Sequence, residues 1–92
     1  MLIESEKTIE RKLKKYVENL GGLCIKLVCL HFTGLPDRML LLPGGVCKFA
    51  EIKTTKEKPK PRQKYVARQL RKLGFEVWII DSTIELRKMM KC

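Results

Sequence analysis

The sequence predicts an α/β fold in which a mixed four-stranded sheet is flanked by helices. Apolar residues recur with helical or strand spacing in the order helix, three strands, helix, strand, helix. A Pro-Gly-Gly turn joins the second and third strands as a hairpin. The third strand, the second helix and the fourth strand must then form a right-handed parallel crossover. We therefore expect an antiparallel meander with one parallel strand added.

The length of 92 residues predicts one domain that spans residues 1–92. The longest apolar runs are strand-length and far too short to cross a membrane. The first residues become charged at once, so we expect no secretory signal and no membrane partner.

Residues 5–20 are predicted to form an amphipathic helix that begins at the N-cap Ser5 and stops at Gly21-Gly22. Its apolar stripe is Ile9, Leu13, Tyr16, Val17 and Leu20. Residues 23–29 are dense in strand-forming residues and are expected to be the first strand. Gly34 and Pro36 then indicate a loop over residues 31–36.

Residues 37–42 and 46–53 are predicted to be strands, joined by the turn Pro43-Gly44-Gly45. Two prolines indicate a surface loop from residue 54 to about residue 62, and a second helix from about residue 61 to residue 73. The expected apolar stripe of this helix is Tyr65, Val66, Leu70 and Leu73.

Residues 75–80 are apolar on both faces, which predicts a fourth strand in the interior of the sheet. Trp78 on this strand is expected to lie in the core and not to stack on bases. Ser82 and Glu85 form a capping-box pattern that begins a third helix. Its apolar residues are Ile84, Leu86, Met89 and Met90.

The four cysteines are expected to be mostly buried free thiols, because three of them lie in strand patterns and no secretory signal accompanies them. The alternative is a zinc site, although the paired spacing typical of such sites is absent. That site would consist of Cys24, Cys29, His31 and Cys47.

Positive charge is the first indication of function. Twenty Lys and Arg against ten Asp and Glu give a net charge of +10, which favours a polyanionic partner. Between residues 53 and 72 lie nine basic residues and one acid, Glu57. This run is either a solvated face or, as its single sign favours, a phosphate-binding surface. The basic residues are Lys53, Lys56, Lys58, Lys60, Arg62, Lys64, Arg68, Arg71 and Lys72.

Two carboxylates and a lysine interrupt the apolar pattern of neighbouring strands. Glu51 and Lys53 share one face of their strand, and Asp37 begins the adjacent antiparallel strand. The hairpin therefore brings Asp37 and Glu51 together. Two close carboxylates repel each other unless a cation such as Mg²⁺ binds between them, with the carbonyl of Ile52 as a further ligand. The alternative is a surface Glu–Lys pair and an unrelated turn aspartate.

These residues resemble a known nuclease family. Gly34-Leu35-Pro36-Asp37-Arg38, the hairpin, Phe49-Ala50-Glu51-Ile52-Lys53 and the helical Gln63 occur in this order over nearly the whole chain. The set is similar to the VRR-NUC (virus-type replication-repair nuclease) family of the PD-(D/E)xK superfamily.

The resemblance implies a restriction-endonuclease-like αβββαβα core and a phosphodiesterase that uses Mg²⁺ or Mn²⁺. Asp37 and Glu51 would bind the metal, Lys53 would be catalytic, and Gln63 would help to fix the site. It also implies a homodimer that resembles Holliday-junction resolvases and acts on DNA in the cytoplasm of a bacterial or phage-infected cell.

The superfamily also tends to place a glutamate of the first helix at the site. Glu10 is the first candidate and Glu6, one turn earlier, the second; either could instead be a solvated ion-pair partner. Lys26 could grip phosphate or merely extend to solvent, and Arg38 could contact the DNA backbone. His31 is a candidate general acid, although a lone histidine is more often structural.

Three kinds of function fit the sequence. The first is a structure-selective DNA endonuclease, as a dimer suited to symmetric cleavage of a four-way junction. The second is a restriction-type enzyme, which the short chain disfavours because it leaves little room for base-reading insertions. The third is a non-catalytic or partner-dependent nucleic-acid-binding module on the same fold. RNA is a further candidate substrate, because phosphate contacts alone do not distinguish the sugars.

Overall fold

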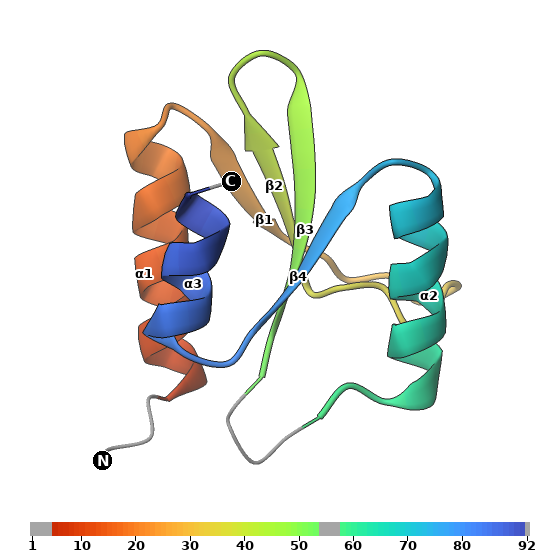
Figure 1. The fold of residues 1–92 in the computed structure, drawn as a ribbon. Coiled ribbons are helices and arrows are strands. Elements are labelled where there is room, and N and C mark those ends of the chain that lie inside the picture. Colours follow the sequence, from red (N-terminus) through yellow and green to blue (C-terminus); the bar gives the residue numbers. More distant parts are fainter. Residues whose placement is uncertain (1–4, 54–57, 92) are drawn as a thin grey trace.

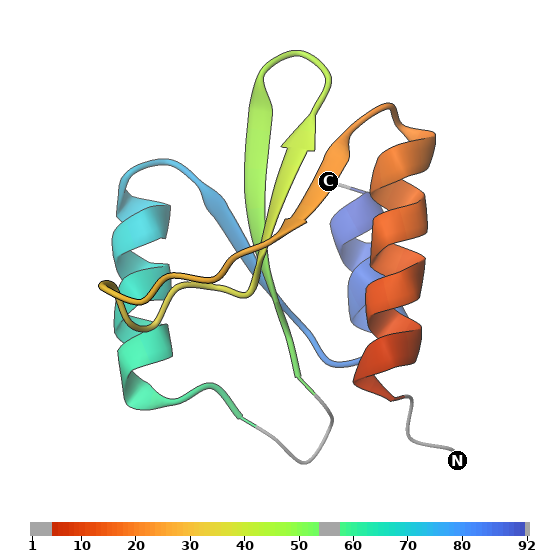
Figure 2. The ribbon, with the colours of Figure 1, turned by 180° about the vertical axis from the view of Figure 1, so that it is seen from behind.

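A four-stranded sheet separates two layers of helices (Figure 1). The computed structural model describes residues 5–53 and 58–91. Helices α1 (Glu6–Asn19) and α3 (Thr83–Met90) lie side by side on one face of the sheet, and α2 (Pro61–Lys72) lies on the other (Figures 1 and 2). This arrangement confirms the predicted α/β fold.

The strands follow one another across the sheet in the order in which they occur in the chain. They are β1 (Leu23–Lys26), β2 (Arg38–Leu42), β3 (Val46–Ile52) and β4 (Glu76–Ile80). The first three pair antiparallel, and β4 pairs parallel with β3. Gly44 and Gly45 both have positive φ, at 85° and 74°, so the hairpin between β2 and β3 turns at the two residues that can adopt this conformation most easily.

Alternation along β2 and β3 directs neighbouring residues to opposite helix layers. Leu40 and Ala50 belong to the core under α1 and α3, whereas Phe49 belongs to the core under α2. The antiparallel register pairs Leu42 with Val46 at the turn and Arg38 with Ala50 at the far end. One further step in the same register places Asp37 opposite Glu51.

The two cores differ in size. The one beneath α1 and α3 is the larger: Ile9, Leu13, Val17, Leu40, Ala50, Ile52, Ile80, Leu86 and Met89. The core beneath α2 contains Phe49, Ala67 and Val77, with partly buried Leu27, Met39, Cys47 and Leu70 packed against it. Burial of apolar surface therefore stabilises mainly the α1–α3 layer, and the α2 layer has fewer apolar contacts to the sheet.

Two predictions about the strands are wrong. The first strand ends at Lys26 and not at residue 29: Leu27 still donates to the carbonyl of Asp37, but Val28 and Leu30 are 79% and 87% exposed. The fourth strand is at the edge of the sheet and not in its interior. It is apolar on both sides because helices cover both of its faces, and a covered face does not require a strand on each side.

The helix caps are as predicted, and the apolar stripes are narrower. Ser5 and Ser82 accept hydrogen bonds from the backbone N–H groups of Thr8 and Glu85. Several residues predicted to be in the stripes are exposed: Leu20, Tyr65, Leu73, Ile84 and Met90. The small side chain of Ala67 is buried instead, next to Val66, so α2 contacts the sheet through less bulk than expected.

Trp78 is partly buried against the larger core, as predicted, and its indole N–H donates to Glu76 at 3.0 Å. Cys24, Cys29 and Cys47 are free thiols. Cys24 and Cys47 are half-buried, but Cys29 is exposed because the chain has left the sheet there. Within residues 5–53 and 58–91, no helix has the length and apolar character needed to cross a membrane.

Candidate active site

Asp37, Glu51 and Lys53 meet at the ends of β2 and β3, on the face of the sheet that α2 covers. The backbone N–H of Ile52 donates to Oδ1 of Asp37 at 3.3 Å, which fixes the aspartate against the end of β3. Nζ of Lys53 lies 3.8 Å from Oε2 of Glu51. The strand alternation and the hairpin register therefore assemble three residues that are 14 and 2 positions apart in the sequence.

The side chain of Glu51 is buried, and one of its carboxylate oxygens has no hydrogen-bond partner among the described residues. It is 5% exposed, and its Oε1 is buried with no hydrogen-bond partner among the described residues. Burial and, to a smaller extent, the negative charge of Asp37 raise the pKa of Glu51 to about 7, although the positive charge of Lys53 opposes this shift. Burial also raises the pKa of Asp37, against the opposing charge of Arg38. The pKa of each carboxyl group is thus raised, and because the two groups lie close together, their protonation is coupled.

The donor set fits a hard divalent cation. Two carboxylates and a nearby peptide carbonyl offer the oxygen ligands that Mg²⁺ and Mn²⁺ accept, and Glu51 has a buried oxygen free to bind. Over the described residues, no three His, Cys, Asp or Glu side chains gather as a ligand set. A cation at this position would therefore need the carbonyl of Ile52 and water as well as the two carboxylates. The alternative zinc site on Cys24, Cys29, His31 and Cys47 does not form.

Arg38 connects helix α1 to Asp37. Its Nη2 lies 3.0 Å from Oε1 of Glu10, and its Nη1 donates to the carbonyl of Asp37 at 3.1 Å and lies 3.6 Å from Asp37 Oδ1. Strand alternation turns Arg38 away from α2 and toward α1, where it is 5% exposed. Arg38 is therefore buried against α1, and its contact with DNA stays a prediction. The same contact brings Glu10 next to the site through Arg38, whereas Glu6 is exposed.

The loop before Asp37 is clamped onto α2 by Arg62. Nε of Arg62 donates to the carbonyl of Thr33 at 3.2 Å, and its guanidinium lies 5.5 Å from the ring centroid of Phe32 and 5.3 Å from that of Tyr65. Gly34 has a φ of +88°, and a Cβ there would lie 2.8 Å from the carbonyl oxygen of Arg62. Arg62, predicted to contact DNA, therefore holds the loop that leads to Asp37. The sequence offered only Phe32 and Tyr65 as a signal for this contact.

The remaining candidates are spread around the site. Gln63 accepts a hydrogen bond from the backbone N–H of Lys60 at 2.9 Å and so caps α2. Lys26 is exposed at the end of β1, and His31 is exposed in the clamped loop. Lys56 lies outside the described residues. The other predicted nucleic-acid contacts have exposed side chains: Lys58, Lys60, Lys64 and Arg68.

Comparison with known proteins agrees with this geometry. No family model matches the sequence. The chain is 38% identical over 82 residues to a protein of Acyrthosiphon pisum secondary endosymbiont phage 1 named "Putative nuclease p44", covering 89% of this chain and 88% of that one. A solved structure titled "VRR_NUC domain" is 33% identical and superposes with a TM-score of 0.86 over 94% of each chain.

Replacing Gly34 by alanine should loosen the loop before Asp37. The new Cβ would meet the backbone oxygen of Arg62, and alanine disfavours a φ of +88°, so we expect a loss of about 1–3 kcal/mol in the free energy of unfolding. Urea denaturation measures this loss. Gly44→Ala is the matched control, because Gly44 has a φ of +85° with nothing within 4 Å of a Cβ. Equal losses in the two variants would show that the contact with Arg62 is unimportant.

The stability of the metal-free protein should fall as the pH rises from about 4.5 to about 7. The pKa of Glu51 is raised from 4.5 to about 7 in the folded state, so over this range the folded chain binds more protons than the unfolded chain. The contribution of Glu51 to the free energy of unfolding is then fully present below pH 4.5 and is lost as the pH rises through about 7. Urea unfolding in EDTA at a series of pH values tests this.

Glu51→Gln should remove this decline, because glutamine has no proton to lose. Glu18→Gln, at an exposed position of α1, should retain it. An unchanged decline in Glu51→Gln would mean that another group is responsible.

Proposed function

The chain belongs to the VRR-NUC family of PD-(D/E)xK nucleases, and from that premise we propose that it is a Mg²⁺- or Mn²⁺-dependent endonuclease that hydrolyses phosphodiester bonds in DNA. The observation that carries the proposal is the buried, unpartnered oxygen of Glu51 beside a second carboxylate and a lysine. A purely basic binding surface has no use for a buried carboxylate beside a second, half-buried one, because their burial is costly unless a cation binds to them.

Asp37, Glu51 and the carbonyl of Ile52 are the residues that would hold the cation. When bound, it would supply Lewis-acid polarisation of the scissile phosphate and a lower pKa for an attacking water. Binding also requires Glu51, whose pKa is raised to about 7, to lose its proton, so metal affinity should increase with pH. The hydrogen bond from Ile52 to Asp37 orients the aspartate before any cation arrives.

Lys53 supplies fixed positive charge at the same position. Its ammonium group, 3.8 Å from Glu51 Oε2, can donate to the phosphate as negative charge develops on it, or orient the attacking water. Because the Lys53 side chain is 14% exposed, its charge is weakly screened. Lys53 is therefore assigned the catalytic role, and the carboxylates the metal-binding role.

Glu10 and Arg38 act as positioning residues in this proposal. Arg38 donates to the carbonyl of Asp37, and Glu10 holds the guanidinium from the other side. Gln63 contributes indirectly, because its hydrogen bond to Lys60 closes the first turn of α2. These contacts support a rigid carboxylate arrangement and do not reach the phosphate themselves.

We assign DNA binding to four exposed cations on α2 and on the segment before it: Lys58, Lys60, Lys64 and Arg68. The net charge of +10 and the position of α2 over the catalytic face support contacts with phosphates rather than with base edges. Lys26 and the exposed His31 are assigned peripheral roles at most, the first as a phosphate contact and the second as a proton donor. RNA remains a substrate to test.

The proposed assembly is a homodimer of single-domain subunits that cuts branched DNA. One site per chain cuts one strand, so a two-fold pair suits symmetric cleavage of a four-way junction. The phage origin of the 38% identical relative supports action in the cytoplasm of a bacterial or phage-infected cell.

Metal binding is testable apart from catalysis. At pH 8, Mn²⁺ at about one hundred times its dissociation constant should raise the free energy of unfolding by about 2.7 kcal/mol. Asp37→Asn and Glu51→Gln should lose this stabilisation, while Glu18→Gln should keep it. Thermal unfolding with and without Mn²⁺ provides the measurement. Equal stabilisation of wild type and Asp37→Asn would place the cation elsewhere.

Cleavage is tested on a four-way junction, a flap, a linear duplex, single-stranded DNA and RNA, with Mg²⁺ or Mn²⁺. We expect paired cuts near the junction point, and a rate at least about 100-fold lower for Asp37→Asn with DNA affinity largely retained, since even indirect supports of a metal site contribute 10–100-fold. Preferential cutting of another substrate would support the nuclease activity but reject the four-way junction as the preferred substrate. Tight binding with no cutting of any substrate would indicate the non-catalytic or partner-dependent module.

A further inference from the structure

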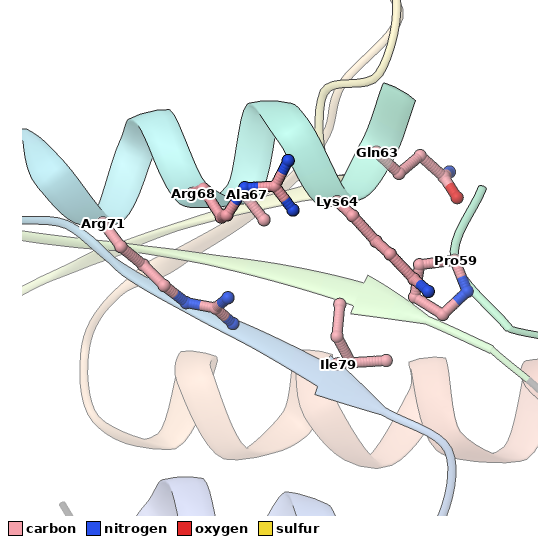
Figure 3. A pocket seen from close by; sticks show the side chains of 7 residues that line it. All are labelled: Pro59, Gln63, Lys64, Ala67, Arg68, Arg71 and Ile79. Atoms are coloured by element: carbon pink, nitrogen blue, oxygen red, sulfur yellow. The ribbon is translucent and has the colours of Figure 1, made fainter. Parts of the chain in front are cut away.

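We propose that the cavity between α2 and β4 holds one phosphodiester of the bound strand, close to the phosphodiester that is cut. This inference rests on the proposed nuclease function and adds a discrete phosphate site to it. The cavity has a volume of about 170 Å³. Its lining residues are Pro59, Gln63, Lys64, Ala67, Arg68, Arg71 and Ile79 (Figure 3).

Three cations on one stripe of α2 line this cavity. Lys64, Arg68 and Arg71 are spaced four and three residues apart, so their side chains emerge on the same side of the helix. Figure 3 shows Lys64 and Arg71 reaching from α2 toward β4, with Ile79 below them. Among the described residues, those that line the cavity include no carboxylate. Like charges that line one cavity repel one another, and a bound anion relieves that repulsion.

The chemistry of the lining favours a phosphate over a base. Guanidinium and ammonium groups offer only donors, and a guanidinium matches the paired oxygens of a phosphate. Apart from Gln63, the other described lining residues are Pro59, Ala67 and Ile79, which offer no aromatic ring on which a base could stack. Oε1 of Gln63, an acceptor, already bonds to Lys60. A backbone phosphate is therefore the part of a nucleic acid that fits.

The cavity is next to the catalytic carboxylates. Ile79, which lines it, is the parallel partner of Glu51 across β3 and β4. Adjacent strands lie about 4.8 Å apart, and successive phosphates of a DNA strand advance about 3.4 Å along the helix axis. When one phosphate of a DNA strand lies at Glu51, a second phosphate one or two nucleotides away therefore lies at the cavity.

Arg71 fixes one wall of the cavity. It donates to the carbonyl of Val77 and so ties α2 to β4. This contact makes Arg71 a poor position for a test, because its loss would disturb the packing of α2. Lys64 and Arg68 have exposed side chains and suit substitution better.

The first experiment measures the salt dependence of DNA binding by fluorescence anisotropy in EDTA, where no metal-dependent cleavage occurs. The proteins are wild type, Lys64→Gln, Arg68→Gln and the double variant. Because both cations hold the same phosphate, the double variant should lose only about 0.7–0.9 from the slope of log K against log salt, the contribution of one phosphate. A loss of twice that size would overturn the proposal, because it would mean that Lys64 and Arg68 contact two different phosphates.

Lys72→Gln is the matched control. Lys72 is exposed on the last turn of the same helix, carries the same charge and does not line the cavity. It should leave the slope unchanged. A decrease of about 0.7–0.9 in Lys72→Gln, equal to that expected for the double variant, would mean that any cation of α2 contributes alike, and the discrete site would be rejected.

The second experiment identifies the phosphate. Single uncharged methylphosphonate linkages are placed in turn along a DNA strand. At one position, within a few nucleotides of the cut, wild type should bind about tenfold more weakly, as for the loss of a charged hydrogen bond of about 1.4 kcal/mol. The double variant should show no effect at that position. If no position distinguishes the two proteins, the cavity does not hold a phosphate.

These readouts need no cleavage, so they separate the cavity from the nuclease assignment. A position-specific effect in a protein that cuts nothing would support the phosphate site and reject the enzyme. Metal-dependent cleavage with identical scans for wild type and the double variant would support the enzyme and reject the site.

Discussion

The antiparallel register between β2 and β3 is the constraint on which the site depends. It pairs Leu42 with Val46 at the turn and carries Asp37 to the position opposite Glu51 at the other end. A shift of one residue would send Glu51 and Lys53 to the opposite face of the sheet, into the apolar core under α1 and α3. The two glycines of the turn set the register, and the hydrogen bond from Ile52 to Asp37 secures it at the site. A backbone pairing thus determines the geometry of the carboxylates.

The two faces of the sheet differ in role: one mainly stabilises the fold, and the other contains the candidate active site. The face under α1 and α3 contains the larger apolar core, whereas the face under α2 contains a small core and the carboxylates. An enclosed glutamate with an unpartnered oxygen is destabilising by itself, and the large core on the other face can compensate for it. Arg38 joins the two sides, because it lies under α1 and contacts Asp37. The site therefore contains a destabilising buried glutamate, and the apolar core on the opposite face of the sheet offsets its cost.

Helix α2 has several separate contacts, and this explains why its charges are not equivalent. Arg62 clamps the loop before Asp37, Arg71 ties the helix to β4, and Lys64 and Arg68 remain exposed beside the cavity. A run of basic residues that is uniform in the sequence is thus divided into structural and exposed members. The division follows from the helical rotation, which presents successive residues to the loop, the strand and solvent.

The sequence by itself determined the order of the elements, the hairpin, the two serine caps and the proximity of Asp37, Glu51 and Lys53. These features depend on local signals: apolar periodicity, turn residues and the strict alternation of strand side chains. The sequence did not determine the end of β1, the edge position of β4, the burial of Arg38 or the clamp formed by Arg62. Each of these depends on which surfaces meet in three dimensions. Periodicity shows that β4 has two covered faces but not what lies at its edges, and the charge of Arg38 or Arg62 does not show whether a glutamate, a carbonyl or a solvent-exposed phosphate is near. Only the packing of α1 and α2 against the sheet decided those partners.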